Sequence, residues 1–213
     1  MDIYASDDEK GEDIKRWWRE NGRSVIAGSI LGIAVIFSGR YWLTYQQVQS
    51  ENAANTYQQL SILIADGKRN DADDKNQLLL SEFSSTPYAV FAAFDMANQA
   101  ISNDDSEAAK SYLEWVIVNA TLTGHVEIAR LRLAKLFLAE FDYENAVSLA
   151  NESSSDSFAS LFSELRGDIF SAQGKLMEAR AAYQGSIVTL VEGEPRRVLL
   201  NMKIDDMAIA DDS

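Results

Sequence analysis

Residues that could support catalytic or metal chemistry are few in this chain of 213 residues. It has one histidine, His125, and no cysteine, so neither a zinc site built on thiolates nor a cysteine–histidine pair can be assembled. The GxSxG, SxxK and GxxxxGK[ST] patterns, which position a nucleophile or cradle a phosphate, are also missing from the sequence. We therefore expect no catalytic residue, no cofactor and no metal, and we place His125 in an exposed loop beside Gly124.

The densest acidic run, Asp71 to Asp74, is the remaining candidate for a metal site. It lacks the alternating spacing and the glycine of an EF-hand loop, so it could attract calcium only weakly. We interpret residues 68–76 as a solvated loop that leads into a helix carrying Leu78, Leu79 and Phe83. Asp73 and Asp74 would then lie in the first turn of that helix, where the helix dipole favours negative charge.

The charge of the chain limits its partners. The formal net charge is −14, and residues 41–213 hold 13 Lys and Arg against 26 Asp and Glu. Such a surface repels phosphate backbones, so nucleic acid is not an expected partner. The absence of cysteine excludes disulfides but is compatible with either redox compartment.

The stretch from Ser24 to Thr44 determines how the rest of the chain is organised. Its first sixteen residues carry no charge and the remainder carries only Arg40. As a helix it reaches about 30 Å, enough to cross the hydrocarbon core of a bilayer. A cleaved signal peptide has a shorter apolar core and a small-residue cleavage site, whereas bulky aromatic residues follow here. A buried helix of a soluble protein would need a surrounding core that the amphipathic remainder does not offer.

Basic residues predict the orientation of this span. Four lie just before it, Lys15, Arg16, Arg19 and Arg23, whereas after Arg40 no Lys or Arg occurs until Lys68. The positive-inside rule then keeps the N-terminus in the cytoplasm. Aromatic residues at both ends, Trp17 and Trp18 before and Tyr41, Trp42 and Tyr45 after, suit the two membrane interfaces. We expect a cytoplasmic tail (1–23), a transmembrane helix (24–44) and a domain on the far side of the membrane (45–213), in a single-pass protein of the lipid bilayer.

Two features near the span are open to more than one interpretation. Ser24, Gly28 and Gly32 recur every four residues and would form a stripe on which another helix could pack closely, although glycine is also simply common in transmembrane helices. In the tail, residues 13–20 could form a brief helix that Asn21-Gly22 ends. That tail is either an orientation signal or a short peptide recognised by a cytoplasmic partner.

Beyond the span the chain indicates helices throughout. Residues 46–65 have apolar positions at helical spacing, so we expect an amphipathic helix continuous with the span, ended by Gly67. Pro87 is expected to begin a later helix. Three following phrases align in one register, with small residues first at Ala97, Ala134 and Gly167 and again at Ala109, Ala146 and Ala179. The intervals of 37 and 33 residues bracket the ~34-residue tetratricopeptide period, and the extra residues fit the loop 119–126.

Close packing explains such a register. A small residue in each helix of a hairpin lets the two backbones approach, and several hairpins must stack because one alone cannot bury its apolar face. The last helix, residues 196–204 after Pro195, would present Val198, Leu199 and Met202 and cap the stack. The fold class is therefore all-α: one N-terminal transmembrane helix followed by a tetratricopeptide-like solenoid. Three unrelated helical hairpins are the alternative.

In a solenoid of this kind the first helix of each repeat would line a concave surface. We call the nine residues that the register places there the first-helix face. They are Phe94, Asn98 and Ile101, then Leu131, Lys135 and Leu138, then Glu164, Asp168 and Ser171. The mixture of apolar and charged side chains suits a groove that binds a polypeptide.

The whole chain resembles a known family. The start MDIYASDDEKGEDIKRWWRENGRSVIAGSILGIAVIFSGRYWLTYQQ, the repeat LRGDIFSAQGKLMEARAAY and the terminal NMKIDD are similar to the YfgM family of ancillary SecYEG translocon subunits from Gram-negative bacteria. The resemblance implies an inner-membrane protein with a periplasmic repeat domain. It also implies association with SecYEG and with the periplasmic chaperone PpiD, in the handling of newly translocated, unfolded polypeptides.

Two functions of different classes follow. In the first, the protein is a membrane-tethered scaffold whose repeat surface captures a partner protein or an unfolded segment. In the second, it is a structural subunit whose span docks on a membrane complex while the domain only spaces or shields. An enzyme finds no support, because catalysis needs convergent titratable groups. We favour the scaffold.

Overall fold

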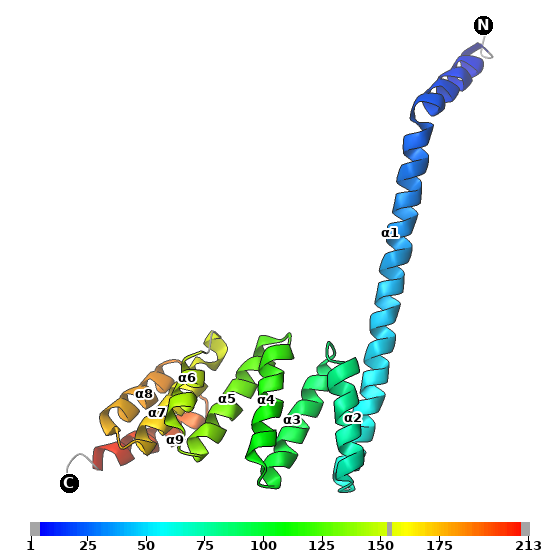
Figure 1. The fold of residues 1–213 in the computed structure, drawn as a ribbon. Coiled ribbons are helices and arrows are strands. Elements are labelled where there is room, and N and C mark those ends of the chain that lie inside the picture. Colours follow the sequence, from blue (N-terminus) through cyan, green and yellow to red (C-terminus); the bar gives the residue numbers. More distant parts are fainter. Residues whose placement is uncertain (1–4, 153–154, 210–213) are drawn as a thin grey trace. The chain divides into compact units, whose positions relative to one another are not determined.

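Residues 5–152 and 155–209 are described by the computed structural model, and every regular element among them is helical (Figure 1). The all-α prediction is therefore confirmed. The elements in chain order are α1 (Ala5–Ala65), α2 (Arg69–Glu82), α3 (Pro87–Ser102), α4 (Ser106–Asn119), α5 (Thr123–Ala139), α6 (Tyr143–Asn151), the 3₁₀ turn η1 (Asp156–Phe158), α7 (Ala159–Ala172), α8 (Leu176–Val188) and α9 (Arg196–Ile209).

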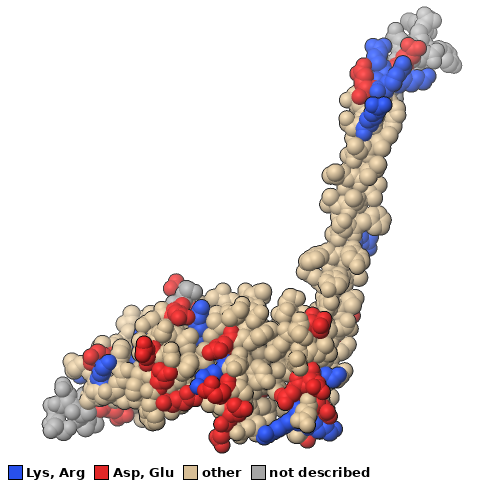
Figure 2. Space-filling view, viewed as in Figure 1, with Lys and Arg blue, Asp and Glu red and all other residues tan. Residues whose placement is uncertain are grey.

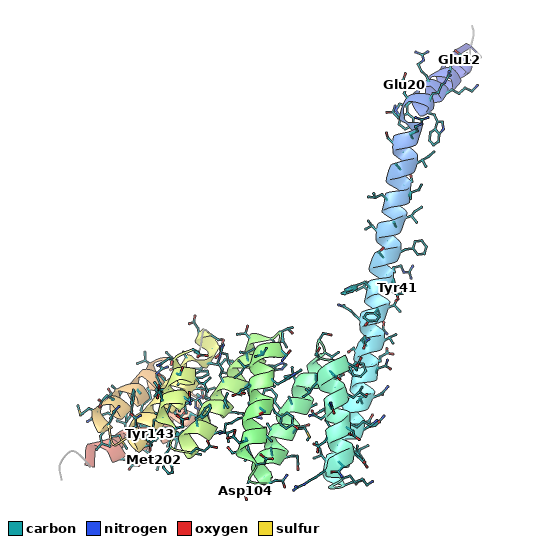
Figure 3. The ribbon with its side chains drawn as sticks, in the orientation of Figure 1. Glu12, Glu20, Tyr41, Asp104, Tyr143 and Met202 are labelled. Atoms are coloured by element: carbon teal, nitrogen blue, oxygen red, sulfur yellow. The ribbon has the colours of Figure 1, made fainter. Side chains whose placement is uncertain are left out.

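The chain divides into two compact units, residues 1–51 and 52–213. The first unit consists of α1, whose side chains project on all sides along the helix (Figure 3). Large apolar side chains there are uncovered: Ile30 is 63% exposed, Leu31 69% and Phe37 71%. Within the described residues, α1 is the one helix long and apolar enough to cross a membrane. A core helix of a soluble protein would bury these side chains, whereas a lipid environment suits them.

The predicted end of a short tail helix at Asn21-Gly22 is wrong, because α1 runs through both residues without interruption. The Asn21 side chain donates to the backbone oxygen of Trp17, four residues earlier, at 3.2 Å. An Asn-Gly pair ends a helix only when the following residues leave helical geometry. Here a long run of helix-compatible residues follows.

The second unit begins with the last turns of α1, which bury Ala53 and Leu60 and end before Gly67, as predicted. The predicted loop over residues 68–76 is wrong, since α2 already begins at Arg69. Ala72 and Asn76 are buried on its inner side. A helix that buries only one residue per turn has so few apolar positions that its sequence looks like a solvated loop.

Four helical hairpins of the second unit share one turn geometry. The residues at the turns have positive φ: Gly67 (70°), Asp104 (59°), Phe141 (63°) and Gly174 (73°). At each turn the following amide donates to the backbone oxygen five residues earlier, at 2.9 Å, as in Lys68 to Leu63 and Asp142 to Phe137. This 6→1 bond is that of a Schellman motif. The turns are spaced by 37, 37 and 33 residues, so the chain is a helical-repeat protein.

The turn positions reveal a repeat that the sequence did not. We number the repeats first (the end of α1 with α2), second (α3 and α4), third (α5 and α6) and fourth (α7 and α8). In the first repeat, Leu60 stands at the position of Ala97, Ala134 and Gly167, seven residues before the turn. A large residue there hides the small-residue marker. The expected small residues of the other three repeats, Ala97, Ala134 and Gly167, then Ala109, Ala146 and Ala179, are all buried.

Helix α9 follows Pro195 and packs on α8, as expected of a terminal helix. Its buried side differs from the prediction. Leu200 is fully buried, with Ile204 and Met207 beside it, whereas Val198, Leu199 and Met202 are 67%, 47% and 59% exposed (Met202 is labelled in Figure 3). Both sets have helical spacing, so only the neighbouring helix α8 decides which of them is covered.

Candidate protein-binding surface

The first-helix face lies on α3, α5 and α7, with three equivalent residues on each helix. Asn98, Ile101 and Lys135 are exposed. Phe94, Leu131, Leu138, Glu164, Asp168 and Ser171 are half-buried. Leu131 and Leu138 pack on the apolar core around Phe162, so only part of each side chain is available to a binding partner.

Contacts between helices join the α3 and α5 parts of this face. The guanidinium carbon of Arg132 lies 4.9 Å from the centre of the Phe94 ring, and Arg132 donates to the side-chain oxygen of Asn98 at 3.5 Å. The cation over an aromatic face fixes both side chains. Arg132 is thus a further member of this surface, which the register did not include because it lies one position away from Leu131.

The face continues toward the first repeat through an aromatic cluster. Tyr57 of α1 lies 6.0 Å from Tyr88 and 6.1 Å from Phe91 of α3, measured between ring centres. The Tyr57 hydroxyl donates to Asp95 at 2.8 Å, and burial, followed by this hydrogen bond, raises the pKa of Tyr57. Tyr57 occupies the register position of Phe94, so once the first repeat is recognised it could be found from the sequence.

The prediction of an exposed loop at His125 is wrong. His125 lies in the first turn of α5, is half-buried, and stacks edge-on against Phe91 and Phe94 at 5.7 and 6.4 Å. Only residues 120–122 separate α4 from α5, so the loop is shorter than the one expected over 119–126. A histidine against two aromatic rings is a packing residue of the first-helix face.

The α7 part of the face is occupied by helix α9. Lys203 donates to Glu164 at 2.9 Å and to Asp168 at 2.6 Å, and Arg196 pairs with Glu164 at 3.3 Å. Glu164 and Asp168 therefore hold the terminal helix. The part of the first-helix face open to a partner therefore lies on α3 and α5, and the aromatic cluster around Tyr57 extends it toward the first repeat.

In the first unit, the predicted helix-packing stripe is bare. A Cβ added to Gly28 or Gly32 would meet no atom of the described chain within 4 Å. Basic and acidic residues collect at the N-terminal end of α1, and a long uncharged length follows (Figure 2). The basic residues expected to orient the span, Lys15, Arg16, Arg19 and Arg23, are all exposed.

Among the described residues, no group of three or more His, Asp or Glu side chains could hold a metal ion. The arrangement is that of a helical-repeat domain attached to an apolar helix.

Comparison with known families settles what kind of chain this is. The family model described as tetratricopeptide repeat-like domain matches residues 15–209. The chain belongs to this family. The match includes most of α1 as well as the repeats.

Curated relatives in the family carry one name. The ancillary SecYEG translocon subunit of Haemophilus influenzae is 29% identical over 86% of this chain and 90% of its own. The subunit of Escherichia coli is 24% identical over 98% of this chain and 100% of its own length. The subunit of Neisseria gonorrhoeae is 24% identical over 97% of this chain and 100% of its own length. The resemblance to the YfgM family is thereby confirmed. No solved structure matches the chain.

Proposed function

We propose that this protein is a non-enzymatic membrane adaptor that associates with the SecYEG translocon and holds a periplasmic chaperone, PpiD, near newly translocated polypeptides. The observation that carries this proposal is the end-to-end similarity to the ancillary SecYEG translocon subunit of Escherichia coli, which covers 98% of this chain and all of that protein. The resemblance supplies PpiD and the translocating polypeptides as partners.

The span is the surface proposed to dock on the translocon. Ser24, Gly28 and Gly32 would let a neighbouring transmembrane helix approach closely, because small side chains leave room for backbone contact. The bare surface around Gly28 and Gly32 supports this role. The four basic residues before the span would keep the N-terminus in the cytoplasm of the bacterial inner membrane and place the repeats in the periplasm.

The open part of the first-helix face is the surface proposed to hold the chaperone or a polypeptide segment. Aromatic side chains, Arg132 and Lys135 lie along it, and aromatic and arginine residues are those that contribute most at protein interfaces. The alternative is a structural subunit whose repeat domain only spaces or shields. That alternative predicts no protein neighbour at this face.

The docking of the span can be tested in the full-length protein. Gly28→Leu combined with Gly32→Leu should reduce the recovery of translocon subunits in mild detergent, because bulky side chains prevent close helix approach. The matched control is Ala27→Leu combined with Ala34→Leu, which places two Leu side chains on α1 about 100–120° around the helix from the stripe. Equal recovery with both double variants would contradict docking through the stripe.

The repeat surface can be tested in the same cells with a photo-reactive amino acid at Lys135, an exposed position, and with one at Met202 on α9 as the control. The adaptor function predicts cross-links to a periplasmic protein from position 135 and not from position 202. Lys135→Glu should weaken that capture while translocon recovery persists. Absence of any protein cross-link from position 135 would favour the structural subunit.

A further inference from the structure

A recess lies on the side of α3 away from the first-helix face, between α2 and α4, and α3 forms its floor. It is a cavity of about 980 Å³ open to solvent, within the residues 63–115 of the first two repeats. Tyr112 and Trp115 of α4 form one wall, and the rest is lined by a mixture of apolar side chains, such as Leu63, Leu80 and Met96, and polar ones. This volume is in the range of sites that bind small molecules or peptide side chains.

Comparison with the next repeat shows why the recess is empty. One repeat later, Phe137 of α5 packs on the core around Leu113, with the Lys110 ammonium 5.3 Å from the centre of its ring. At the positions equivalent to Phe137 and Lys110, 37 residues earlier, the recess has Ala100 and Asp73. An alanine leaves open the volume that a phenyl ring fills one repeat later.

Asn76 contributes a polar group to the wall of this recess, where its side chain hydrogen-bonds to Tyr112 of α4. Asn76, at the position equivalent to the apolar Leu113, is 3% exposed and lines the cavity. Its side-chain oxygen accepts no hydrogen bond within the described residues. The recess thus has an amide where the next repeat has an apolar side chain, so its wall is more polar at this position.

The charges around the recess favour a basic ligand. Its charged lining residues are two acids, Asp73 and Asp105, against one base, Arg69. The Arg69 guanidinium donates to the side chain of Asn103, and Asp105 accepts from the Ala108 amide. Burial, followed by the nearby charges of Asp73 and Asp105, raises the pKa of Tyr112 on the facing wall. Its phenol therefore experiences a negative field in the recess.

We propose that the recess between α2, α3 and α4 binds a partner polypeptide, taking in one aromatic side chain from a segment that carries Lys or Arg beside it. The aromatic ring occupies the volume that Phe137 fills in the third repeat. The adjacent cation reaches Asp73 or Asp105. The inference rests on the adaptor function only for the class of ligand, a polypeptide, and adds a site separate from the first-helix face.

The test uses the full-length protein in phosphatidylcholine nanodiscs. The probe is a short fluorescent peptide with a Phe-Leu pair flanked by lysines, and binding is followed by fluorescence anisotropy against empty nanodiscs. A second peptide has Glu in place of each Lys, and a third has Ala in place of Phe. Saturable binding of the first peptide and at least about tenfold weaker binding of the other two are expected.

Two variants locate the binding. Ala100→Phe fills the recess with the side chain that the third repeat carries, and should abolish peptide binding while circular dichroism and thermal unfolding show a folded domain. Ser102→Phe adds the same ring at an exposed position of the same helix and should leave binding unchanged. Asp73→Lys, at an exposed position, should weaken binding severalfold and gives an answer even if Ala100→Phe unfolds the domain.

A benzophenone in place of the peptide's Phe should cross-link within residues 63–81 or 96–115. Binding that survives both Ala100→Phe and Asp73→Lys, or cross-links only outside these segments, would overturn the site. Translocon recovery is measured in parallel with the Gly28 and Gly32 variants, which leave the recess intact. Failure of docking and failure of peptide binding are therefore separate results.

Discussion

Gly167 of α7 lies so close to Tyr183 of α8 that a Cβ added to Gly167 would come within 2.4 Å of the tyrosine ring. The ring cannot move aside easily. It is buried, its hydroxyl donates to Asp168 at 2.9 Å, and the Lys203 ammonium lies 5.3 Å from its centre. Gly167 therefore has to be small for two reasons: a side chain there would collide with the Tyr183 ring, and it would also hold the backbones of α7 and α8 apart.

We expect Gly167→Ala to lower the free energy of unfolding by about 1–3 kcal/mol, because the added methyl group overpacks the contact with Tyr183. The measurement is urea unfolding followed by circular dichroism. Gly124→Ala in α5 is the matched control, since a Cβ there meets nothing within 4 Å and alanine favours a helix. A Gly167→Ala protein as stable as the Gly124→Ala protein would contradict the packing described.

Phe141 occupies a turn position where the first and fourth repeats have glycine. Its φ of 63° lies in the left-handed region, which is unfavourable for a bulky residue, and its side chain is 74% exposed. Phe141→Gly should therefore stabilise the repeats by up to about 1 kcal/mol. The converse change, Gly174→Ala at a φ of 73°, should destabilise them by about 1 kcal/mol. Thermal unfolding of the two variants should shift in opposite directions, and a common direction would refute the turn assignment.

Stability should fall at alkaline pH through the contact between α7, α8 and α9. Burial, followed by the Asp168 charge and hydrogen bond, raises the pKa of Tyr183 above 10.0. For Lys203, burial lowers the pKa, but hydrogen bonds to Asp168 and Glu164 outweigh it, so the pKa rises above 10.5. Both groups hold their protons more tightly in the folded state than in the unfolded state. Their contribution is complete below about pH 10 and is lost as pH rises through the folded-state pKa values.

We therefore expect the free energy of unfolding to decrease progressively as the pH rises above about 10, as measured by urea titration at each pH. Tyr183→Phe removes one of the two groups and should make the decrease shallower. An equally steep decrease in that variant would show that the Tyr183 hydroxyl contributes nothing to the pH dependence.

The orientation of the span should depend on its basic flank. A reporter active only in the periplasm, fused to the C-terminal end, should be active in the wild type and lose activity when Lys15, Arg16, Arg19 and Arg23 are made neutral. Glu12→Gln with Glu20→Gln is the control and should change little, because acidic residues contribute weakly to topology. A reporter active in the cytoplasm of wild-type cells would contradict the proposed orientation.

Much of the fold could be predicted from the sequence, because the signals involved are local. A long uncharged run predicts an apolar helix from its own composition. The small residues at Ala134 and Ala146 predict a hairpin because they recur at a fixed interval along the chain. The turn at Gly67 and the start of α3 at Pro87 follow from the backbone preferences of single residues.

Other features depend on which surfaces meet in three dimensions. The first repeat was hidden because Leu60 replaces the small marker and because its first helix is the continuation of α1. The side of α9 that is buried depends on α8, and the partners of Glu164 and Asp168 come from α9. The sequence register placed these two carboxylates on a free face because it contains no information on what the terminal helix covers.

The sequence alone determined that the chain has an apolar span and stacked helical hairpins, because spacing and composition act along the chain. Only the tertiary structure decided where the stack is filled and where it is open. Ala100 and Phe137 are unremarkable in the sequence, yet between facing helices one leaves a recess and the other fills it. Packing volume is a property of several side chains from different helices, so it appears only when those helices are assembled.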